Sequence, residues 1–267
     1  MNKVFKSISI VFIVFVLAMT SGCGSNDSKS KDTVYEDMKE SFDAAGLLSS
    51  NIGIFSKTEN DGSISYGECG SGVIFKKDDD SYYALTSAHV VSNENAQILV
   101  FTVNTEMKTD TIPGVDYNVL SPEVYDTMYT ADVVYVSTRD DLAVIRFSCD
   151  KDLSLVEIAT EDPKKGDRIM CIGNPQSDWF ALSYGKVTSG IEKFGESLGY
   201  PSNVMKHSAY IHAGSSGGAA LNEDMKLIGI VPGGSFSPNG DTFRFGVLIP
   251  VSEIKICLSE WGEIGEQ

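Results

Sequence analysis

A series of short runs rich in Val, Ile, Phe and Tyr, between residues 51 and 250, restricts the fold of this chain more than any other feature. Gly, Asn, Asp and Ser separate the runs, and no stretch with a helical period lies between them. This pattern predicts an antiparallel β-sandwich or β-barrel and excludes a parallel α/β fold. The runs are NIGIFS (51–56), GSGVIFK (70–76), YYALTS (82–87), QILVFTV (97–103), DVVYVS (132–137), LAVIRF (142–147), DRIMCIG (167–173), ALSYGKVTSGI (181–191), SAYIHA (208–213), KLIGIV (226–231) and FRFGVLIP (243–250).

One short helix is expected on each side of this all-β region. Thr33 and Glu36 have the spacing of a capping box, so residues 34–48 should form a helix that ends near Gly46. Residues 251–262, after Pro250, should form the other helix. The side chains expected to face the core are Tyr35, Met38, Phe42 and Ala45 in the first helix, and Ile254, Ile256 or Cys257, and Trp261 in the second.

The N-terminal segment resembles a bacterial lipoprotein signal. Residues 1–22 combine early lysines with an apolar stretch, and small residues precede Cys23, which would carry the lipid. Thr20 stands where an aliphatic residue is usual, and an uncleaved anchor is the alternative. The polar residues 23–33 would form a linker. We therefore expect an exported protein, tethered to the membrane on its extracytoplasmic face.

Charge and cysteine content limit the partners. The 267 residues carry a formal net charge of -16, which argues against a nucleic-acid partner because binding to phosphates requires clustered Lys and Arg. No cysteine pair has the spacing of a zinc site, and we predict neither metal nor cofactor. Disulfides and free buried thiols both remain open for Cys69, Cys149, Cys171 and Cys257.

The stretch GSSGG at 214–218 is a candidate for the loop of a catalytic serine. It lies between predicted strands, and a serine at a glycine-flanked bend can expose its hydroxyl while nearby backbone N–H groups converge, although a simple small-residue turn is the alternative. A serine nucleophile needs a base. His89 ends an apolar strand and Asp141 opens another, although each also fits a structural role.

Six motifs together resemble the trypsin-like serine proteases, and among them the HtrA (Deg) branch. They are GSGVIF (70–75), LTSAHVV (85–91), DDLAVI (140–145), GNP (173–175), GSSGG (214–218) and FGVLIPV (245–251). The resemblance implies a double six-stranded antiparallel β-barrel within a protease domain at 34–267, with barrel 1 at about 50–150 and barrel 2 at about 160–251. Ala219, Ser215 and His212 depart from the residues usual in that family.

The resemblance also implies roles for individual residues. Ser216 would be the nucleophile, His89 the general base and Asp141 the residue that orients the imidazole. The backbone N–H groups of Gly214 and Ser216 would form the oxyanion hole. Asp140 and His207 are expected at the surface.

Substrate contacts are expected from two segments. Tyr210 would lie at the base of the specificity pocket, which argues against a preference for Lys or Arg, and His212 would line the cleft. A substrate backbone would pair with the strand at 227–234. Gly229, Ile230 and Val231 in that strand suggest a small or medium aliphatic side chain before the scissile bond.

These features predict a serine endopeptidase that acts on exported or surface proteins or peptides. A non-catalytic peptide-binding or chaperone-like module on the same fold is the alternative, and an esterase would use the same site. Too few residues follow Pro250 for the PDZ module that is common in the HtrA branch. Because trimers are common in that branch, a homo-oligomer remains an open alternative. The sequence does not indicate a role for the long insert at 105–129.

Overall fold

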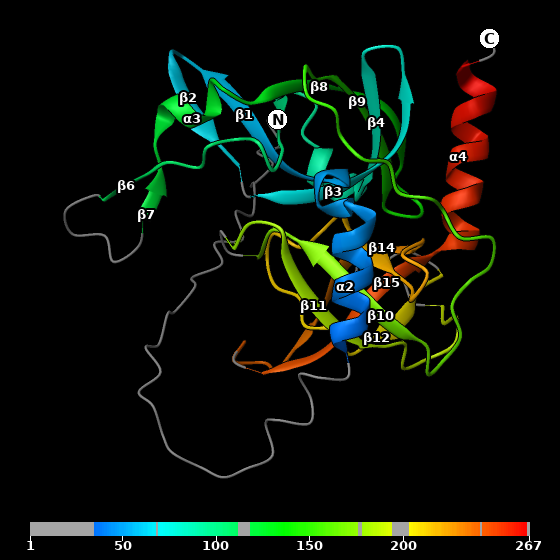
Figure 1. The fold of residues 1–267 in the computed structure, drawn as a ribbon. Helices are drawn as coiled ribbons and strands as arrows, with labels where there is room; N and C mark the ends of the chain where they lie inside the picture. The colour runs from blue at the N-terminus through cyan, green and yellow to red at the C-terminus, as the bar shows by residue number, and fades with distance from the viewer. Residues whose placement is uncertain are drawn as a thin grey trace, which may run out of the picture. The chain divides into compact units, whose positions relative to one another are not determined.

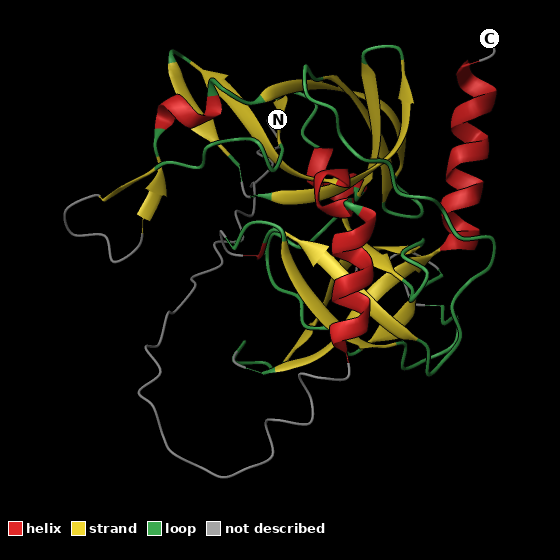
Figure 2. Ribbon diagram, viewed as in Figure 1, coloured by secondary structure: helices red, strands yellow, loops and turns green. Residues whose placement is uncertain are grey.

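Antiparallel strands in two main sheets make up most of the computed structural model, which describes residues 35–67, 69–111, 118–175, 178–193, 203–240 and 242–265 (Figures 1 and 2). The predicted export signal, Cys23 and the linker lie outside the described residues. In chain order the elements are α2 (Glu36–Ala45), η2 (Leu47–Ser50), β1 (Asn51–Asn60), β2 (Ser63–Tyr66), β3 (Gly70–Asp78), β4 (Ser81–Thr86), η3 (Ala88–Val91), β5 (Gln97–Phe101), β6 (Thr109–Thr111), β7 (Asn118–Leu120), α3 (Pro122–Tyr125), β8 (Tyr129–Ser137), β9 (Leu142–Ser148), β10 (Arg168–Gly173), β11 (Ala181–Lys186), β12 (Met205–His207), β13 (Gly218–Leu221), β14 (Leu227–Phe236), β15 (Phe243–Pro250) and α4 (Val251–Gly265).

The first sheet closes into a barrel. Its strand order is β2-β1-β3-β4-β9-β8-β5, and a further pairing of β1 with β5 completes a ring of six strands. Alternate side chains of these strands fill the interior, where Ile54, Ile74 and Ile145 are fully buried. The second sheet has the order β11-β10-β13-β14-β15-β12, and one bridge between Val187 and His207 links its outer strands. The predicted all-β double barrel is confirmed.

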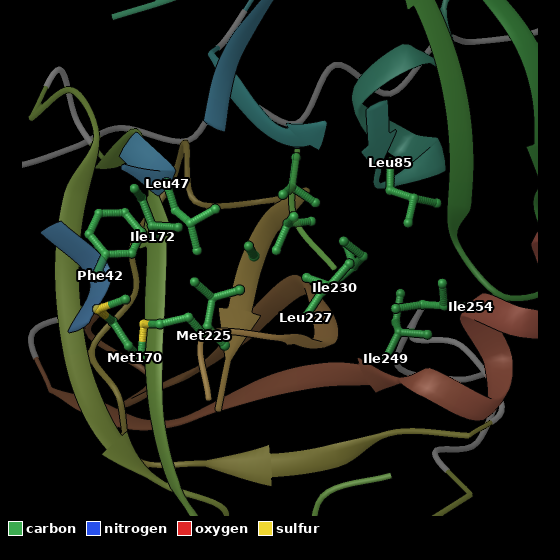
Figure 3. Close-up of a cluster of buried hydrophobic side chains, with 14 of the residues drawn as sticks. Phe42, Leu47, Leu85, Met170, Ile172, Met225, Leu227, Ile230, Ile249 and Ile254 are labelled. Atoms are coloured by element: carbon green, nitrogen blue, oxygen red, sulfur yellow. The ribbon is translucent and has the colours of Figure 1, made fainter. Parts of the chain in front are cut away.

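A shared apolar cluster joins the two barrels (Figure 3). Leu85 from β4 belongs to the same cluster as Ile172 from β10 and Ile230 from β14, and each of these is at most 2% exposed. Since close packing in a protein interior resists displacement, this cluster fixes the position of one barrel against the other. The loops at the junction therefore keep a defined separation.

The two flanking helices pack on this core, as predicted, with small differences. Met38 and Phe42 of α2 are buried, whereas Ala45 is exposed and the turn after Gly46 becomes η2. Figure 1 shows α2 across β10 and β11, where Tyr35 stacks on Tyr184. No helix within the described part of the chain is both long and apolar enough to span a bilayer.

The C-terminal helix α4 extends to Gly265, a little further than expected. Ile254 and Cys257 are fully buried, while Ile256 is 43% exposed, which decides between the two alternatives. The Trp261 ring lies against Phe75 and Tyr83 of the first barrel.

Some sequence predictions were wrong or incomplete. Residues 208–213 form no strand and lead instead into the glycine-rich loop. The short strands β2, β6, β7, β12 and β13 were not predicted. The insert contains α3, whose Tyr125 ring stacks on that of Tyr66. Cys69, Cys149, Cys171 and Cys257 are free thiols.

His207 is fully buried, so its predicted surface position is wrong. It pairs with Gly246 across β12 and β15, and a Cβ on that glycine would come 2.1 Å from the imidazole ring. Among the described residues neither ring nitrogen has a hydrogen-bond partner. Burial lowers the pKa of His207 from 6.5 to about 4, and the nearby backbone of Val247 and Ala209 offsets this only in part.

This buried imidazole predicts acid sensitivity. Because the pKa of His207 is lower in the folded state, its protonation favours unfolding: stability is full above about pH 6.5 and falls as the pH drops towards 4. Lowering the pH from 8 to 5 should cost about 2 kcal/mol at this residue. Urea unfolding at both pH values measures this loss of stability in the wild type. The control is His207→Phe, which keeps a ring over Gly246 and should lack the loss. An equal pH dependence in both proteins would contradict the assignment.

Candidate active site

His89 and Asp141 meet because their strands are neighbours. His89 lies in η3 directly after β4, Asp141 directly precedes β9, and β4 pairs with β9. Asp141 Oδ2 lies 2.8 Å from His89 Nδ1, and Oδ1 accepts the backbone N–H of His89 at 2.9 Å. One carboxylate therefore fixes both the ring and the backbone of the histidine.

The backbone of Asp141 takes part in the same contact. Its φ is +52°, in the left-handed region that Asp and Asn adopt more readily than most residues, and its carbonyl accepts the N–H of Ala88 at 3.1 Å. The His89 side chain is 50% exposed and that of Asp141 is 16% exposed. The imidazole thus has one covered edge and one open edge.

Asp140 is buried, so its predicted surface position is wrong. Only 1% of it is exposed, because it accepts hydrogen bonds from Ser137 Oγ and from the Arg139 guanidinium. The adjacent carboxylates therefore have different roles: that of Asp140 secures the turn before β9, and that of Asp141 contacts the histidine.

The two serines of the glycine-rich loop also differ. Ser215 is buried, its N–H donates to His212 O at 2.9 Å, and its Oγ accepts the N–H of His212 at 3.2 Å. Ser216 is half-buried, and its Oγ donates to Pro232 O at 3.0 Å. Within the described ranges no hydrogen bond joins Ser216 to His89. The Ser216 hydroxyl is thus the more accessible one, and it bonds a carbonyl in this state.

Glycines place this loop against the histidine segment. At Gly214, φ is +98° and a Cβ would come 2.2 Å from Asn174 O. At Gly217, φ is +88° and a Cβ would come 2.3 Å from Thr86 Oγ1. Since Thr86 is three residues before His89, the loop that carries Ser216 and the segment that carries His89 are packed together.

Two backbone donors of the loop are unused. The N–H groups of Ser215, Gly217 and Gly218 donate to His212 O, Val231 O and Ser215 O. Those of Gly214 and Ser216 have no acceptor in the part of the chain that the structure describes. A pair of free N–H groups beside a serine is what stabilisation of an oxyanion requires.

Several aromatic side chains lie beside the loop that carries Ser216. The His212 ring lies 5.5 Å from that of Phe236 on β14, and Tyr210 lies 5.3 Å from Phe243. Burial lowers the pKa of His212, and its Nδ1 accepts the N–H of Ala213 at 2.8 Å. Tyr210 and Val231 line a cavity of about 130 Å³ together with Ser215.

Two of the three strand residues predicted to contact substrate are paired on both sides. Gly229 and Ile230 pair with β13 on one side and with β15 on the other. Among the described residues the pairing of β14 with β13 ends at Val231, while the pairing with β15 continues from Gly233 to Phe236.

Ser71 and Asn174 were not predicted as functional residues, although the motifs GSGVIF and GNP contain them. Ser71 Oγ donates to Gly214 O at 2.7 Å and accepts the N–H of Asn174 at 3.0 Å. The signal in the sequence was a polar residue between two glycines at Ser71, and a polar residue between an apolar run and a proline at Asn174. In the described ranges no group of three or more His, Cys, Asp or Glu side chains could hold a metal ion.

The fold is that of a trypsin-like peptidase domain. The chain belongs to the trypsin-like peptidase family, whose domain model matches residues 70–230. Two proteins named serine protease HtrA-like, from Staphylococcus aureus strains MRSA252 and USA300, are each 29% identical to it over 81% and 79% of this chain. The predicted resemblance to the HtrA branch is thereby confirmed. The chain spans 27% and 26% of the length of these relatives, about a quarter.

Solved structures agree in fold. The serine endoprotease from Yersinia pestis superposes with a TM-score of 0.60 at 22% identity, over 86% of this chain and 67% of its own. The HtrA-type protease AlgW, solved with a tripeptide, superposes with a TM-score of 0.62 at 20% identity, over 83% of this chain and 62% of its own.

The packing of Gly214 gives a stability prediction. Gly214→Ala should lower the free energy of unfolding by about 2 kcal/mol or more, because the methyl group meets a backbone oxygen and φ is positive. Gly190→Ala is the control, since nothing lies within 4 Å of its Cβ position, and a change below about 1 kcal/mol is expected. Chemical unfolding measures both, and equal effects would contradict this view of the loop.

Proposed function

We propose that this chain is a serine endopeptidase in which Ser216 is the nucleophile, His89 the general base and Asp141 the residue that orients the imidazole. The observation that carries the proposal is the 2.8 Å contact between His89 Nδ1 and Asp141 Oδ2 beside the loop of Ser216. The unused N–H groups of Gly214 and Ser216 support an oxyanion hole in the same loop.

The reaction begins with a rotation. The Ser216 hydroxyl leaves Pro232 O and turns its proton toward His89 Nε2. As Oγ bonds to the scissile carbonyl carbon, that proton passes to Nε2, and the carbonyl oxygen takes the negative charge near the N–H groups of Gly214 and Ser216. Asp141 remains ionised and holds Nδ1–H, which stabilises the imidazolium.

The proton taken from Ser216 then passes to the leaving group. The imidazolium of His89 gives it to the leaving amine, the C–N bond breaks, and an acyl group remains on Ser216 Oγ. Water then attacks the acyl carbon while His89 takes one of its protons. The carbonyl C–Oγ bond breaks, the imidazolium gives the proton taken from water to Ser216 Oγ, and the carboxylic acid product leaves.

For substrate binding we propose the surface beside the loop of Ser216, where the rings of Tyr210 and His212 lie 6.3 Å apart. Tyr210 supplies no carboxylate for Lys or Arg, and we keep the preference for a small or medium aliphatic side chain before the scissile bond. The rings of His212 and Phe236 would form the wall of that subsite.

A second candidate function is a non-catalytic peptide-binding or chaperone-like module. The bond from Ser216 to Pro232 O favours it, because a hydroxyl held there is not poised for proton transfer to His89. The two candidates differ in whether that bond can be exchanged.

Covalent labelling distinguishes them. A fluorescent organophosphonate should label the wild type and not Ser216→Ala, and Asp141→Asn should slow labelling by about a thousandfold because the imidazole loses its orienting charge. The matched control is Asp140→Asn. It should cost about 1–2 kcal/mol of stability and leave the labelling rate nearly unchanged. A folded wild type that stays unlabelled supports the binding module.

We also propose that the chain is exported and tethered through a lipid on Cys23, with residues 23–33 as a spacer. Its substrates would then be exported or surface proteins, and a homo-oligomer would be compatible with that location. Mass spectrometry of the membrane-extracted protein should find Cys23 as the modified N-terminal residue. A chain that retains residues 1–22, or an unmodified Cys23, would contradict the lipid anchor.

A further inference from the structure

Ser71, on β3 of the first barrel, is the residue through which that barrel holds the catalytic loop of the second. It is 1% exposed. Its Oγ donates to Gly214 O at 2.7 Å, and its backbone N–H donates to Ser216 O at 2.7 Å. A single residue therefore binds the carbonyl groups on both sides of Ser215.

Asn174 determines where the Ser71 hydroxyl points. Its N–H and its Nδ2 donate to Ser71 Oγ at 3.0 and 3.1 Å. A hydroxyl oxygen has two acceptor positions and one proton, so with both positions filled the proton is directed to Gly214 O.

Asn174 is itself held in place. It is 1% exposed, its Nδ2 also donates to Ile52 O at 3.2 Å, and its Oδ1 accepts the N–H of Phe180 at 3.0 Å. Contacts from both barrels thus fix the side chain that orients Ser71.

These bonds fix alternate peptide units of the loop at both ends. In the unit between Gly214 and Ser215, the carbonyl is bound by Ser71 Oγ and the N–H by His212 O. In the unit between Ser216 and Gly217, the carbonyl is bound by the Ser71 N–H and the N–H by Val231 O.

The unit between these two carries the N–H of Ser216, which has no acceptor among the described residues, and its carbonyl accepts the N–H of Gly218 at 2.9 Å. The free N–H of Gly214 adjoins the first clamped unit. Both unused donors therefore take their direction from peptide units that Ser71 holds.

We infer that Ser71 is a positioning residue for the oxyanion hole, oriented by Asn174. The inference rests on the proposed function for its effect on rate, since the hole matters only if Ser216 reacts. It gives the central serine of the GSG motif and the asparagine of the GNP motif one shared task across the junction between the barrels.

The test compares Ser71→Ala with Ser50→Ala in the full-length chain. Ser50 is a matched control: it is also 1% exposed, its Oγ donates to Leu47 O at 2.7 Å, and it accepts Asn51 Nδ2 at 3.2 Å. Both variants lose one buried hydroxyl, so both should show a lower unfolding midpoint. Only Ser71→Ala removes a bond to the catalytic loop.

Two kinetic readouts separate positioning from stability. With a fluorescent peptide as substrate, Ser71→Ala should lower kcat by about 10- to 100-fold with little change in KM, since the hole acts on the transition state. The rate of organophosphonate labelling should fall by a similar factor. Ser50→Ala should keep the wild-type kcat and labelling rate. An unchanged kcat in folded Ser71→Ala overturns the inference.

Amide hydrogen exchange tests the clamp without turnover. Exchange at the N–H groups of Ser215 and Gly217 should speed up by about tenfold or more in Ser71→Ala relative to Ser50→Ala. Equal exchange in the two variants overturns the inference. A wild type that resists labelling while this difference persists would refute the proposed peptidase and leave the clamp supported.

Discussion

The junction between the two barrels is the contact on which the site depends. Its apolar part brings Leu85, Ile172 and Ile230 from three strands into one buried cluster (Figure 3). Its polar part is the bond from Ser71 to the carbonyl of Gly214. Apolar packing sets the distance between the barrels but carries no direction, whereas the buried hydrogen bonds set the direction of individual peptide groups. A reactive serine and a distant histidine need both.

The two sides of the junction are organised differently. The His89–Asp141 contact lies wholly within the first barrel and is complete in this structure. The loop of Ser216 belongs to the second barrel, and the Ser216 hydroxyl donates to Pro232 O. The pair of His89 and Asp141 is thus already formed in this structure, whereas the Ser216 hydroxyl must rotate for the proposed reaction. Such a resting arrangement is compatible with a site that substrate completes.

Much of this could be predicted from sequence, because the signals were local. Alternating apolar runs gave the barrel strands, and GSSGG, LTSAHVV and DDLAVI marked the residues that the fold gathers. What failed depended on tertiary contacts. Asp140 is buried because Arg139 and Ser137 fold back on it, and His207 is buried because its ring covers Gly246. Gly229 and Ile230 pair with β13 and with β15, and a hydrophobic pattern does not show which strands become neighbours.

We propose that an oxyanion bound to Ser216 Oγ lies within reach of two backbone N–H groups that the first barrel holds in place. A crystal structure of the chain after reaction with an organophosphonate would show this arrangement. We expect phosphorus bonded to Ser216 Oγ, a phosphoryl oxygen about 2.7–3.1 Å from the backbone nitrogens of Gly214 and Ser216, and an intact pair of His89 with Asp141. An adduct whose phosphoryl oxygen points into solvent, away from both N–H groups, would contradict it.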